Sequence, residues 1–216
     1  MATLLHLDSS LNGEKSHSRA VTAAFRRTWE AEHPDGTVRY RDLAADPLPH
    51  MTAPAYYASF VASEERTPEQ ASAVALREEL LEEAESADLI LLGAPLYNYT
   101  ISSSLKAWFD HVVTMGRTVA ANPPSLAGKR AVVVASRGGS YQPGTPQEGN
   151  DHALPYLRMI LGEKLGLETE FIIPELTLAP STPAMSELVP QFEESQARAL
   201  ADAEAKAKTL ATQLAS

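Results

Sequence analysis

The stretch LILLGAPLYNY, residues 89–99, joins a continuous apolar run to a turn that carries a proline, two tyrosines and an asparagine. Nearly continuous apolar runs of similar length occupy residues 3–7 and 131–135. Short runs without polar alternation are typical of strands that helices cover on both faces of a parallel sheet. We therefore expect these three runs to form the central strands of such a sheet.

Two other segments have the character of outer strands. Residues 37–42 alternate in polarity, as an edge strand does, and residues 169–173 form a fifth candidate that stops before Pro174. Amphipathic or alanine-rich helical patterns separate or follow these candidates, at residues 21–29, 76–84, 105–113, 154–165 and about 187–214.

The alternation of strands and helices predicts the fold class. We expect an α/β three-layer sandwich, with helices on both faces of a five-stranded parallel sheet in the order 2-1-3-4-5. The sequence contains no internal repeat and no compositional break, so we expect residues 1–216 to form a single domain.

The composition limits the kinds of function. The 216 residues include no cysteine and carry a formal net charge of −10, which excludes thiolate chemistry and disfavours nucleic-acid binding. No apolar run reaches the roughly 18 residues of a membrane span, and the first residues lack the pattern of a secretory signal. Histidines and carboxylates show no metal-ligand spacing. We therefore expect a cytoplasmic protein without a metal and without nucleic-acid or membrane partners.

Three polar or glycine-rich loops follow the expected first, third and fourth strands, at residues 9–18, 95–99 and 136–139. In a sheet of order 2-1-3-4-5, the helices after strands one and three leave on opposite faces, so a crevice opens at the carboxyl ends of these strands. We therefore expect all three loops to line a single ligand site.

The first loop has the chemistry of a phosphate site. It leads into a helix whose first backbone N–H groups lack partners within the helix, and Ser10, Ser16 and Ser18 add hydroxyl donors. The chain has no G-x-x-x-x-G-K-[ST] motif, so a nucleoside triphosphatase is not expected. The pattern indicates a phosphate monoester as the ligand.

The second and third loops suit a flat heterocycle. Residues 95–99 combine tyrosine rings with turn amides, which fit the faces and the edge of an isoalloxazine ring. Gly138 and Gly139 allow backbone N–H groups to approach a ligand without an intervening Cβ, and such donors favour negative charge. Together with the phosphate site, these loops predict bound flavin mononucleotide (FMN).

The chain resembles the FMN-dependent NADH azoreductases, also described as flavodoxin-like NAD(P)H:quinone oxidoreductases, over nearly its whole length. The resemblance is carried by residues 7–18, 94–110, 128–131, 136–139 and 155–157. It implies a flavodoxin-like fold, a homodimer, and ping-pong hydride transfer from NADH or NADPH through FMN to a quinone, azo or nitroaromatic acceptor. It also implies cofactor contacts from Ser10, Ser16, His17, Ser18, Pro95, Leu96, Tyr97, Asn98, Tyr99, Ser136, Arg137, Gly138 and Gly139. No residue is assigned as catalytic, because hydride transfer through a flavin needs no protein acid or base.

One segment departs from the family pattern. Family members usually carry a longer segment with additional aromatic rings after the third helix, where this chain reads GRTVAA at residues 116–121. We expect Val119 and Tyr141 to contact the substrate. The long segments 43–67 and 115–128 are expected to supply walls of the substrate pocket.

Two other functions are compatible with parts of the sequence. A flavodoxin-type electron carrier would hold the same cofactor but would need no substrate pocket. A serine hydrolase is suggested by Asp8, Ser9 and Ser10 after the first strand. Such hydrolases carry their general base near the carboxyl end, and none of the six histidines lies there. The FMN-dependent oxidoreductase is the interpretation that uses all three loops.

Overall fold

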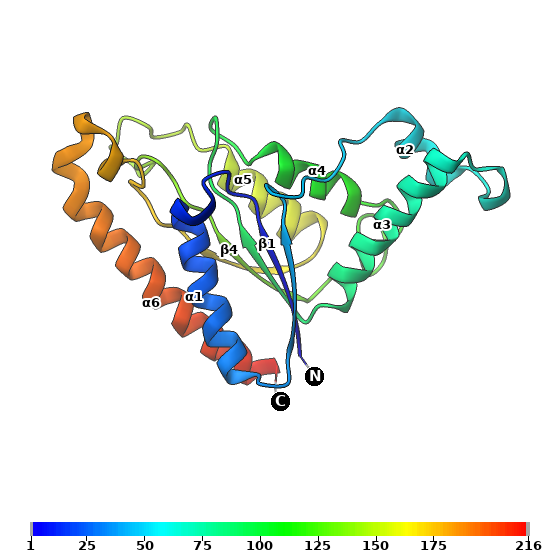
Figure 1. Ribbon diagram of the computed structural model, residues 1–216, viewed down its shortest axis with the longest axis horizontal. Coiled ribbons are helices and arrows are strands. Elements are labelled where there is room, and N and C mark those ends of the chain that lie inside the picture. Colours follow the sequence, from blue (N-terminus) through cyan, green and yellow to red (C-terminus); the bar gives the residue numbers. More distant parts are fainter. Residues whose placement is uncertain (1, 215–216) are drawn as a thin grey trace.

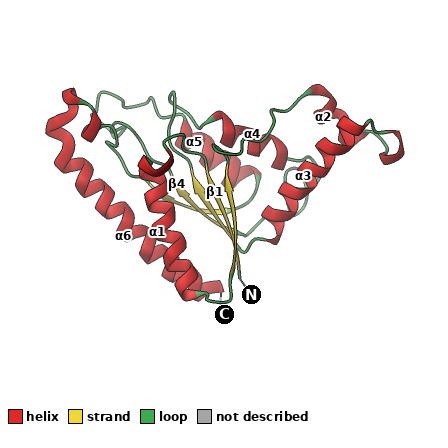
Figure 2. Cartoon of the chain, viewed as in Figure 1, coloured by secondary structure: helices red, strands yellow, loops and turns green. Residues whose placement is uncertain are grey.

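The computed structural model describes residues 2–214 and contains a five-stranded parallel sheet in the order β2-β1-β3-β4-β5 (Figures 1 and 2). The strands are β1 (Thr3–Asp8), β2 (Thr37–Asp42), β3 (Leu89–Gly93), β4 (Arg130–Val134) and β5 (Glu168–Ile172). The helices are α1 (His17–Glu32), α2 (Ala53–Tyr57), α3 (Pro68–Ser86), α4 (Ser103–Val112), α5 (Ala153–Leu157) and α6 (Val189–Leu214). The predicted sheet order is confirmed, and each strand lies within one residue of its predicted bounds.

Helices cover both faces of the sheet, as the apolar strands predicted. α1 and α6 pack against Leu4, Leu91 and Val132 on one face. α3, α4 and α5 pack against Leu5 and Ile90 on the other. Neighbouring residues of a strand point to opposite faces, so each central strand contributes side chains to two separate cores. Within residues 2–214, no helix combines the length and apolar content that crossing a bilayer requires.

The helix predicted at 154–165 has a more complex form. α5 continues as a π-helical segment, Arg158–Lys164, and the chain then turns at Gly166. Gly166 has a φ of 74°, a conformation that glycine adopts without strain. The predicted glycine end of this helix is therefore confirmed, although most of the helix is not α-helical.

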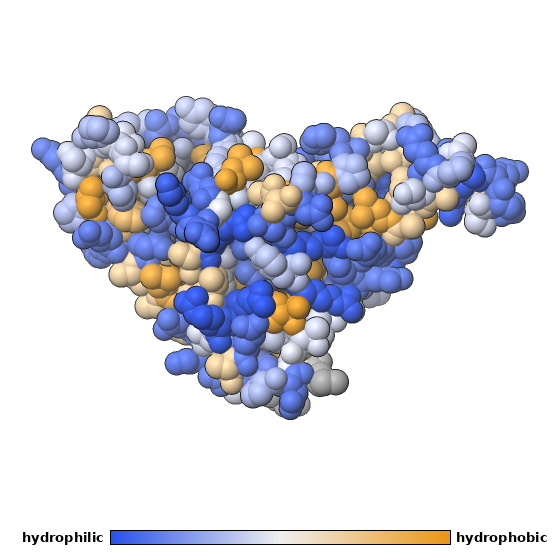
Figure 3. Space-filling view, viewed as in Figure 1, coloured by the Kyte–Doolittle hydropathy of each residue, from blue (hydrophilic) through white to orange (hydrophobic). Residues whose placement is uncertain are grey.

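The segment 43–67 forms an arm together with the first half of α3, and the arm projects from the body at the right of Figure 1. Leu43 and Leu48 anchor its beginning in the core. Tyr56 and Tyr57 of α2, and Phe60 just after it, are 54 %, 60 % and 76 % exposed. Figure 3 shows hydrophobic atoms gathered where the arm joins the body. The arm therefore leaves aromatic side chains without cover in the single chain.

A stability test follows from the contact between β1 and β3. Asp8 is buried beside Gly93, and a Cβ built on Gly93 would lie 2.3 Å from Asp8 Oδ1. We expect Gly93→Ala to lower the free energy of unfolding by about 1–3 kcal/mol, because this buried carboxylate is held by hydrogen bonds from Thr22 and Tyr40 and would have to break them to make space. Gly162→Ala is the matched control, since its nearest neighbour, the carbonyl oxygen of Leu167, lies 4.0 Å away. Urea denaturation measures both; equal stability of the two variants would contradict the prediction.

Candidate functional site

The three predicted loops meet at the carboxyl edge of the sheet. They line a small cavity of about 140 Å³, which we call the inner pocket. Its lining residues are Ser10, Asn12, Ser16, His17, Pro95, Leu96, Tyr97, Ser136, Gly138, Thr177 and Leu178. Each predicted loop contributes at least two of them, so the expected convergence of the loops is present in the structure.

The serine-rich loop presents hydrogen-bond donors at the start of α1. Ser16 caps the helix, because its Oγ accepts from the backbone N–H of Arg19 at 3.2 Å, and it lies 3.1 Å from the Oγ of Ser18. Among residues 2–214, nothing accepts a hydrogen bond from the backbone N–H groups of His17 and Ser18. Free amides at a helix N-terminus, where the helix dipole is positive, form a site for an anion.

A network of charged and polar side chains connects this loop to the strands next to it. The guanidinium group of Arg19 donates to the carbonyl oxygen of Ser10 at 2.9 Å and to both carboxylate oxygens of Asp42 at 2.7 and 2.6 Å. The Arg19 contact also lowers the pKa of Asp42. Tyr40 donates to buried Asp8 at 3.2 Å, and burial, followed by the Asp8 charge, raises the pKa of Tyr40 to about 12. The network fixes the loop to β1 and β2.

The loop after β3 is a tight hairpin closed by hydrogen bonds between the backbones of Tyr97 and Thr100. Its two central residues, Asn98 and Tyr99, have φ values of 45° and 68°. Residues other than glycine rarely adopt a positive φ, because this backbone conformation costs of order 1 kcal/mol. Where such residues occur, they are often found at binding sites. The hydroxyl of Tyr97 lies 3.2 Å from Ser10 Oγ and accepts from the N–H of Leu11 at 3.0 Å. The hairpin and the serine loop are therefore one connected unit.

The glycine loop after β4 presents free amides to the same cleft. The segment after β5 uses the carbonyl oxygens of this loop, because Leu178 donates to Gly138 at 3.1 Å and Leu176 to Gly139 at 3.3 Å. Within the described residues, the N–H groups of Gly138 and Gly139 have no acceptor. A Cβ on Gly138 would lie 2.6 Å from the side chain of Leu178, so any larger residue there would displace this side chain from the pocket wall.

Arg137, which was expected to contact the cofactor, lines neither the inner pocket nor the larger cavity beside it, because its side chain turns into the protein. The residue is 2 % exposed, and its guanidinium group donates to Asp151 and to the carbonyl oxygen of Ala135. Asp151 in turn accepts from the first N–H groups of α5, those of Ala153 and Leu154, at 2.9 and 3.0 Å. Arg137 therefore positions the glycine loop relative to α5.

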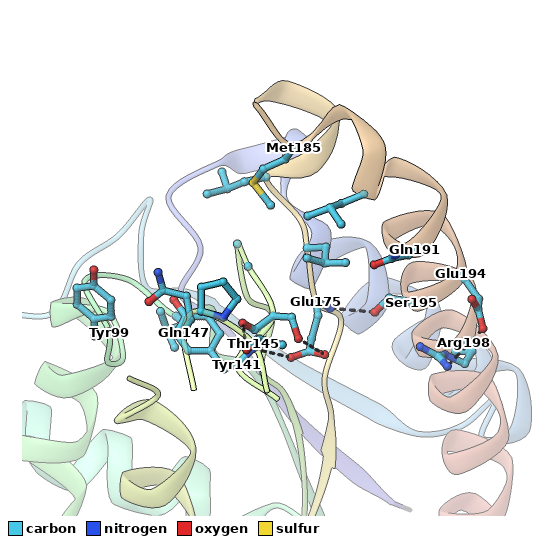
Figure 4. A pocket seen from close by; sticks show the side chains of 18 of the residues that line it. Tyr99, Tyr141, Thr145, Gln147, Glu175, Met185, Gln191, Glu194, Ser195 and Arg198 are labelled. Atoms are coloured by element: carbon cyan, nitrogen blue, oxygen red, sulfur yellow. Dashed lines mark hydrogen bonds and ion pairs between the residues drawn. The ribbon is translucent and has the colours of Figure 1, made fainter. Parts of the chain in front are cut away.

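A larger cavity of about 840 Å³, the outer cavity, adjoins the inner pocket and shares Leu96, Gly138 and Leu178 with it. Figure 4 shows Tyr99, Tyr141 and Gln147 on one side and the first turns of α6 on the other. The predicted residue Tyr141 lines this cavity. So do the predicted residues Asn98 and Gly139. The outer cavity gives the cleft room for a second, larger group beside the anion site.

Two expected contributors lie elsewhere. Val119 is 8 % exposed and packs in the core, so the structure does not place it at the cleft. Residues 115–128 line neither the inner pocket nor the outer cavity. Leu43, Ala44 and Pro47 line a separate cavity of about 630 Å³ on the α4 side of the Tyr97 hairpin. The segment 43–67 therefore lines a cavity beside the hairpin that is separate from the outer cavity, and residues 115–128 line neither of the two cavities described above.

The residues that the sequence analysis missed follow β5 or begin α6. Thr177 and Leu178 line the inner pocket, and Glu175, Gln191, Glu194 and Arg198 line the outer cavity. The residues after β5 could have been predicted, because the segment that follows β5 also leaves the sheet at its carboxyl edge. No comparable signal marked α6, whose alanine-rich pattern describes only the face that it buries.

The site chemistry favours a ligand that combines an anion with a flat polar ring. The hydroxyl of Ser10 is close to Tyr97, and no histidine bonds to it among the described residues, which argues against a serine hydrolase. No group of three or more potential metal ligands occurs in residues 2–214. The donors that the three loops present to the inner pocket are mainly backbone amides and hydroxyls, which suit an anion and a polar ring edge.

Comparison with known proteins identifies several relatives. Residues 2–174 match the family model described as flavodoxin-like fold. An FMN-dependent NADH:quinone oxidoreductase of Streptomyces coelicolor is 58 % identical over 99 % of this chain and 97 % of its own length. A protein of the same name from Streptomyces avermitilis is 55 % identical, with both chains fully covered. The crystal structure of an azoreductase from Bacillus anthracis is 25 % identical and superposes with a TM-score of 0.81, covering 97 % of this chain and 100 % of that one.

The environment of His17 generates a prediction about pH. Its ring contacts Phe192, with ring centroids 4.9 Å apart, and burial lowers its pKa from the ordinary 6.5. The unfolded chain therefore takes up this proton first as the pH falls. The contribution of His17 to stability is complete above about pH 6.5 and is lost as the pH drops toward the lower folded pKa.

We expect the stability difference between His17→Gln and the parent protein to change with pH below about 6.5 and to be constant above it. Urea denaturation between about pH 5 and 8 measures this difference. A difference that stays constant over the whole range would contradict the prediction.

Proposed function

We propose that this chain, which belongs to the flavodoxin-like fold family, is an FMN-dependent NADH:quinone oxidoreductase that also reduces azo compounds. The observation that carries the proposal is that the free amides of α1 and of the glycine loop open into one cleft. Two relatives, 58 % and 55 % identical to this chain, both have this name, and their alignments cover almost the entire chain. The cytoplasm, where NADH is available, is the proposed location.

The residues of the cleft fit FMN. We assign the phosphate to the amides of His17 and Ser18 and to the hydroxyls of Ser10, Ser16 and Ser18. We assign the ring to the hairpin, Pro95, Leu96, Tyr97, Asn98 and Tyr99, and to the glycine loop, Ser136, Gly138 and Gly139. The chemistry that FMN supplies when bound is hydride transfer from NADH to the acceptor in two successive half-reactions.

The protein groups contribute orientation and electrostatics. The amides of Gly138 and Gly139 place partial positive charges at the edge of the ring site, which favours a ring that gains negative charge on reduction. The strained hairpin fixes Asn98 and Tyr99 before any ligand arrives, so less free energy is spent on ordering them at binding. We assign no catalytic acid or base, because hydride transfer through a flavin does not require one.

The outer cavity favours an enzyme over an electron carrier. A carrier exposes the edge of its flavin to a protein partner and needs no enclosed volume beside it. Here a cavity of about 840 Å³ adjoins the ring site, within the size range of small-molecule sites. We propose that it holds the nicotinamide and the acceptor in turn, with Tyr141 as a contact.

The function is tested with the purified protein. After incubation with FMN and gel filtration, we expect retained absorbance at about 450 nm, bleaching by NADH, and recovery on adding a neutral quinone or an azo dye. NADPH, tested in parallel, is expected to bleach the flavin more slowly, because the relatives are named for NADH. Protein that stays colourless with excess FMN would refute the proposal.

The same measurement with Gly139→Val locates the site. The nearest atom to a Cβ on Gly139 lies 4.0 Å away, so the fold accepts a small side chain, but valine would occupy ring space. We expect FMN affinity to fall by about tenfold or more, which corresponds to ~1.4 kcal/mol. The FMN affinity of Gly139→Ala should lie between those of the parent protein and of Gly139→Val.

We also propose that the chain is one domain and assembles as a homodimer. α6 lies outside the matched residues 2–174, yet its Ala203 and Ala207 pack with Phe25 and Trp29 of α1 in one core. The exposed aromatic side chains of the arm support an assembly, because exposed clusters of this kind are frequent in interfaces.

For the dimer, light scattering with size exclusion should give twice the 23.3 kDa of one chain. Phe60→Ser should shift the equilibrium toward the monomer, because Phe60 is 76 % exposed on the arm. Met115→Ser, which changes an exposed residue outside the arm, should leave the dimer intact. Dissociation by Met115→Ser alone would place the interface elsewhere.

A further inference from the structure

The carboxylate of Glu175 lines the outer cavity without a cationic partner. It accepts from the N–H of Tyr141 at 3.3 Å, from Ser140 Oγ at 3.5 Å and from the side chain of Gln142 at 3.4 Å. All three donors are neutral, and no lysine, arginine or histidine pairs with Glu175 among residues 2–214. Figure 4 shows it between the 140–147 loop and α6. Its negative charge is therefore not cancelled within the cavity.

The other charges around the cleft are already paired. Arg198 lies 3.4 Å from Glu194 on the same helix, and both side chains are mostly exposed at the rim of the outer cavity. Arg137 is buried against Asp151. An exposed pair contributes little field because solvent screens it. Among the charged residues that line the outer cavity, the half-buried Glu175 is therefore the one whose charge is neither paired nor fully exposed to solvent.

We propose that Glu175 determines the charge preference for the acceptor: the outer cavity favours neutral and cationic quinones or azo compounds over anionic ones. This inference rests on the proposed function. An anionic acceptor would have to approach an unpaired carboxylate in a partly enclosed space, where a charge acts more strongly than in bulk water. The net charge of −10 opposes the same acceptors at longer range.

The position of Glu175 fits a specificity role in a second respect. Its backbone N–H donates to Ser195 of α6 at 2.9 Å, and the next residue, Leu176, donates to Gly139 of the glycine loop. The backbone is therefore fixed independently of the carboxylate. Changing only the charge of this side chain should leave the ring site in place.

The test uses the oxidative half-reaction, so that the charge of NADH does not enter. Holoprotein is reduced photochemically, and its reoxidation is followed by stopped flow with three naphthoquinones: one neutral, one sulfonated and one carrying a quaternary ammonium group. Glu175→Gln removes the charge and keeps one acceptor oxygen, while an NH2 group replaces either the oxygen that accepts from Tyr141 or the one that accepts from Ser140 and Gln142. Glu194→Gln is the matched control, because it removes a carboxylate that is exposed and paired.

For Glu175→Gln, we expect the rate constant to rise about threefold to tenfold with the sulfonated quinone and to fall by a similar factor with the cationic one. The neutral quinone should change less than about twofold, and added salt should reduce the parent protein's discrimination. Glu194→Gln should change the sulfonated-to-cationic ratio less than Glu175→Gln does.

A second readout needs no turnover. Calorimetric titration of the oxidised holoprotein with naphthalenesulfonate and with a naphthyl trimethylammonium ion should show the same change of preference in Glu175→Gln. An unchanged ratio of anionic to cationic ligands, or equal changes with all three quinones, would overturn the inference. Failure of the parent protein to be reoxidised even by the neutral quinone would instead refute the proposed function.

Discussion

Unpaired backbone N–H groups at the carboxyl edge of the sheet are the feature on which the site depends. The first amides of α1 and those of Gly138 and Gly139 have no acceptor among the described residues, although they lie in or beside a cavity. Because these residues are partly or fully buried, such unpaired groups are costly unless a ligand or water satisfies them. A ligand with a phosphate and a polar ring edge satisfies both sets at once, which is why the cleft suits FMN.

Keeping these amides free requires that other groups hold their loops. Arg137 and Asp151 fix the glycine loop from inside the protein, and the segment after β5 takes up the carbonyl oxygens. Arg19 holds the serine loop through the carbonyl oxygen of Ser10. In each loop, the charged side chains bind the carbonyl oxygens or other side chains and leave the N–H groups exposed to the cleft. This division explains why two arginines near the site serve as structural supports.

Much of the architecture could be predicted from local patterns. The apolar runs at 89–92 and 131–135 predicted buried strands, and the order 2-1-3-4-5 then placed three loops at one edge. The roles of Arg137 and Val119 could not be predicted this way, because a side chain's direction depends on partners distant in sequence, such as Asp151 and the core residues around Val119. The cavity walls from α6 depend on how that helix crosses α1, which the alanine pattern leaves undetermined.

The sequence by itself determined which backbone groups would be available: strand ends, a helix start after serines, and consecutive glycines are local properties of the chain. Only the tertiary structure decided which charges face the cleft. Arg137 is neutralised by Asp151, whereas Glu175 meets only neutral donors. Pairing of charges depends on distances between residues far apart in the chain. Packing of the sheet and helices sets those distances, and no local pattern encodes them.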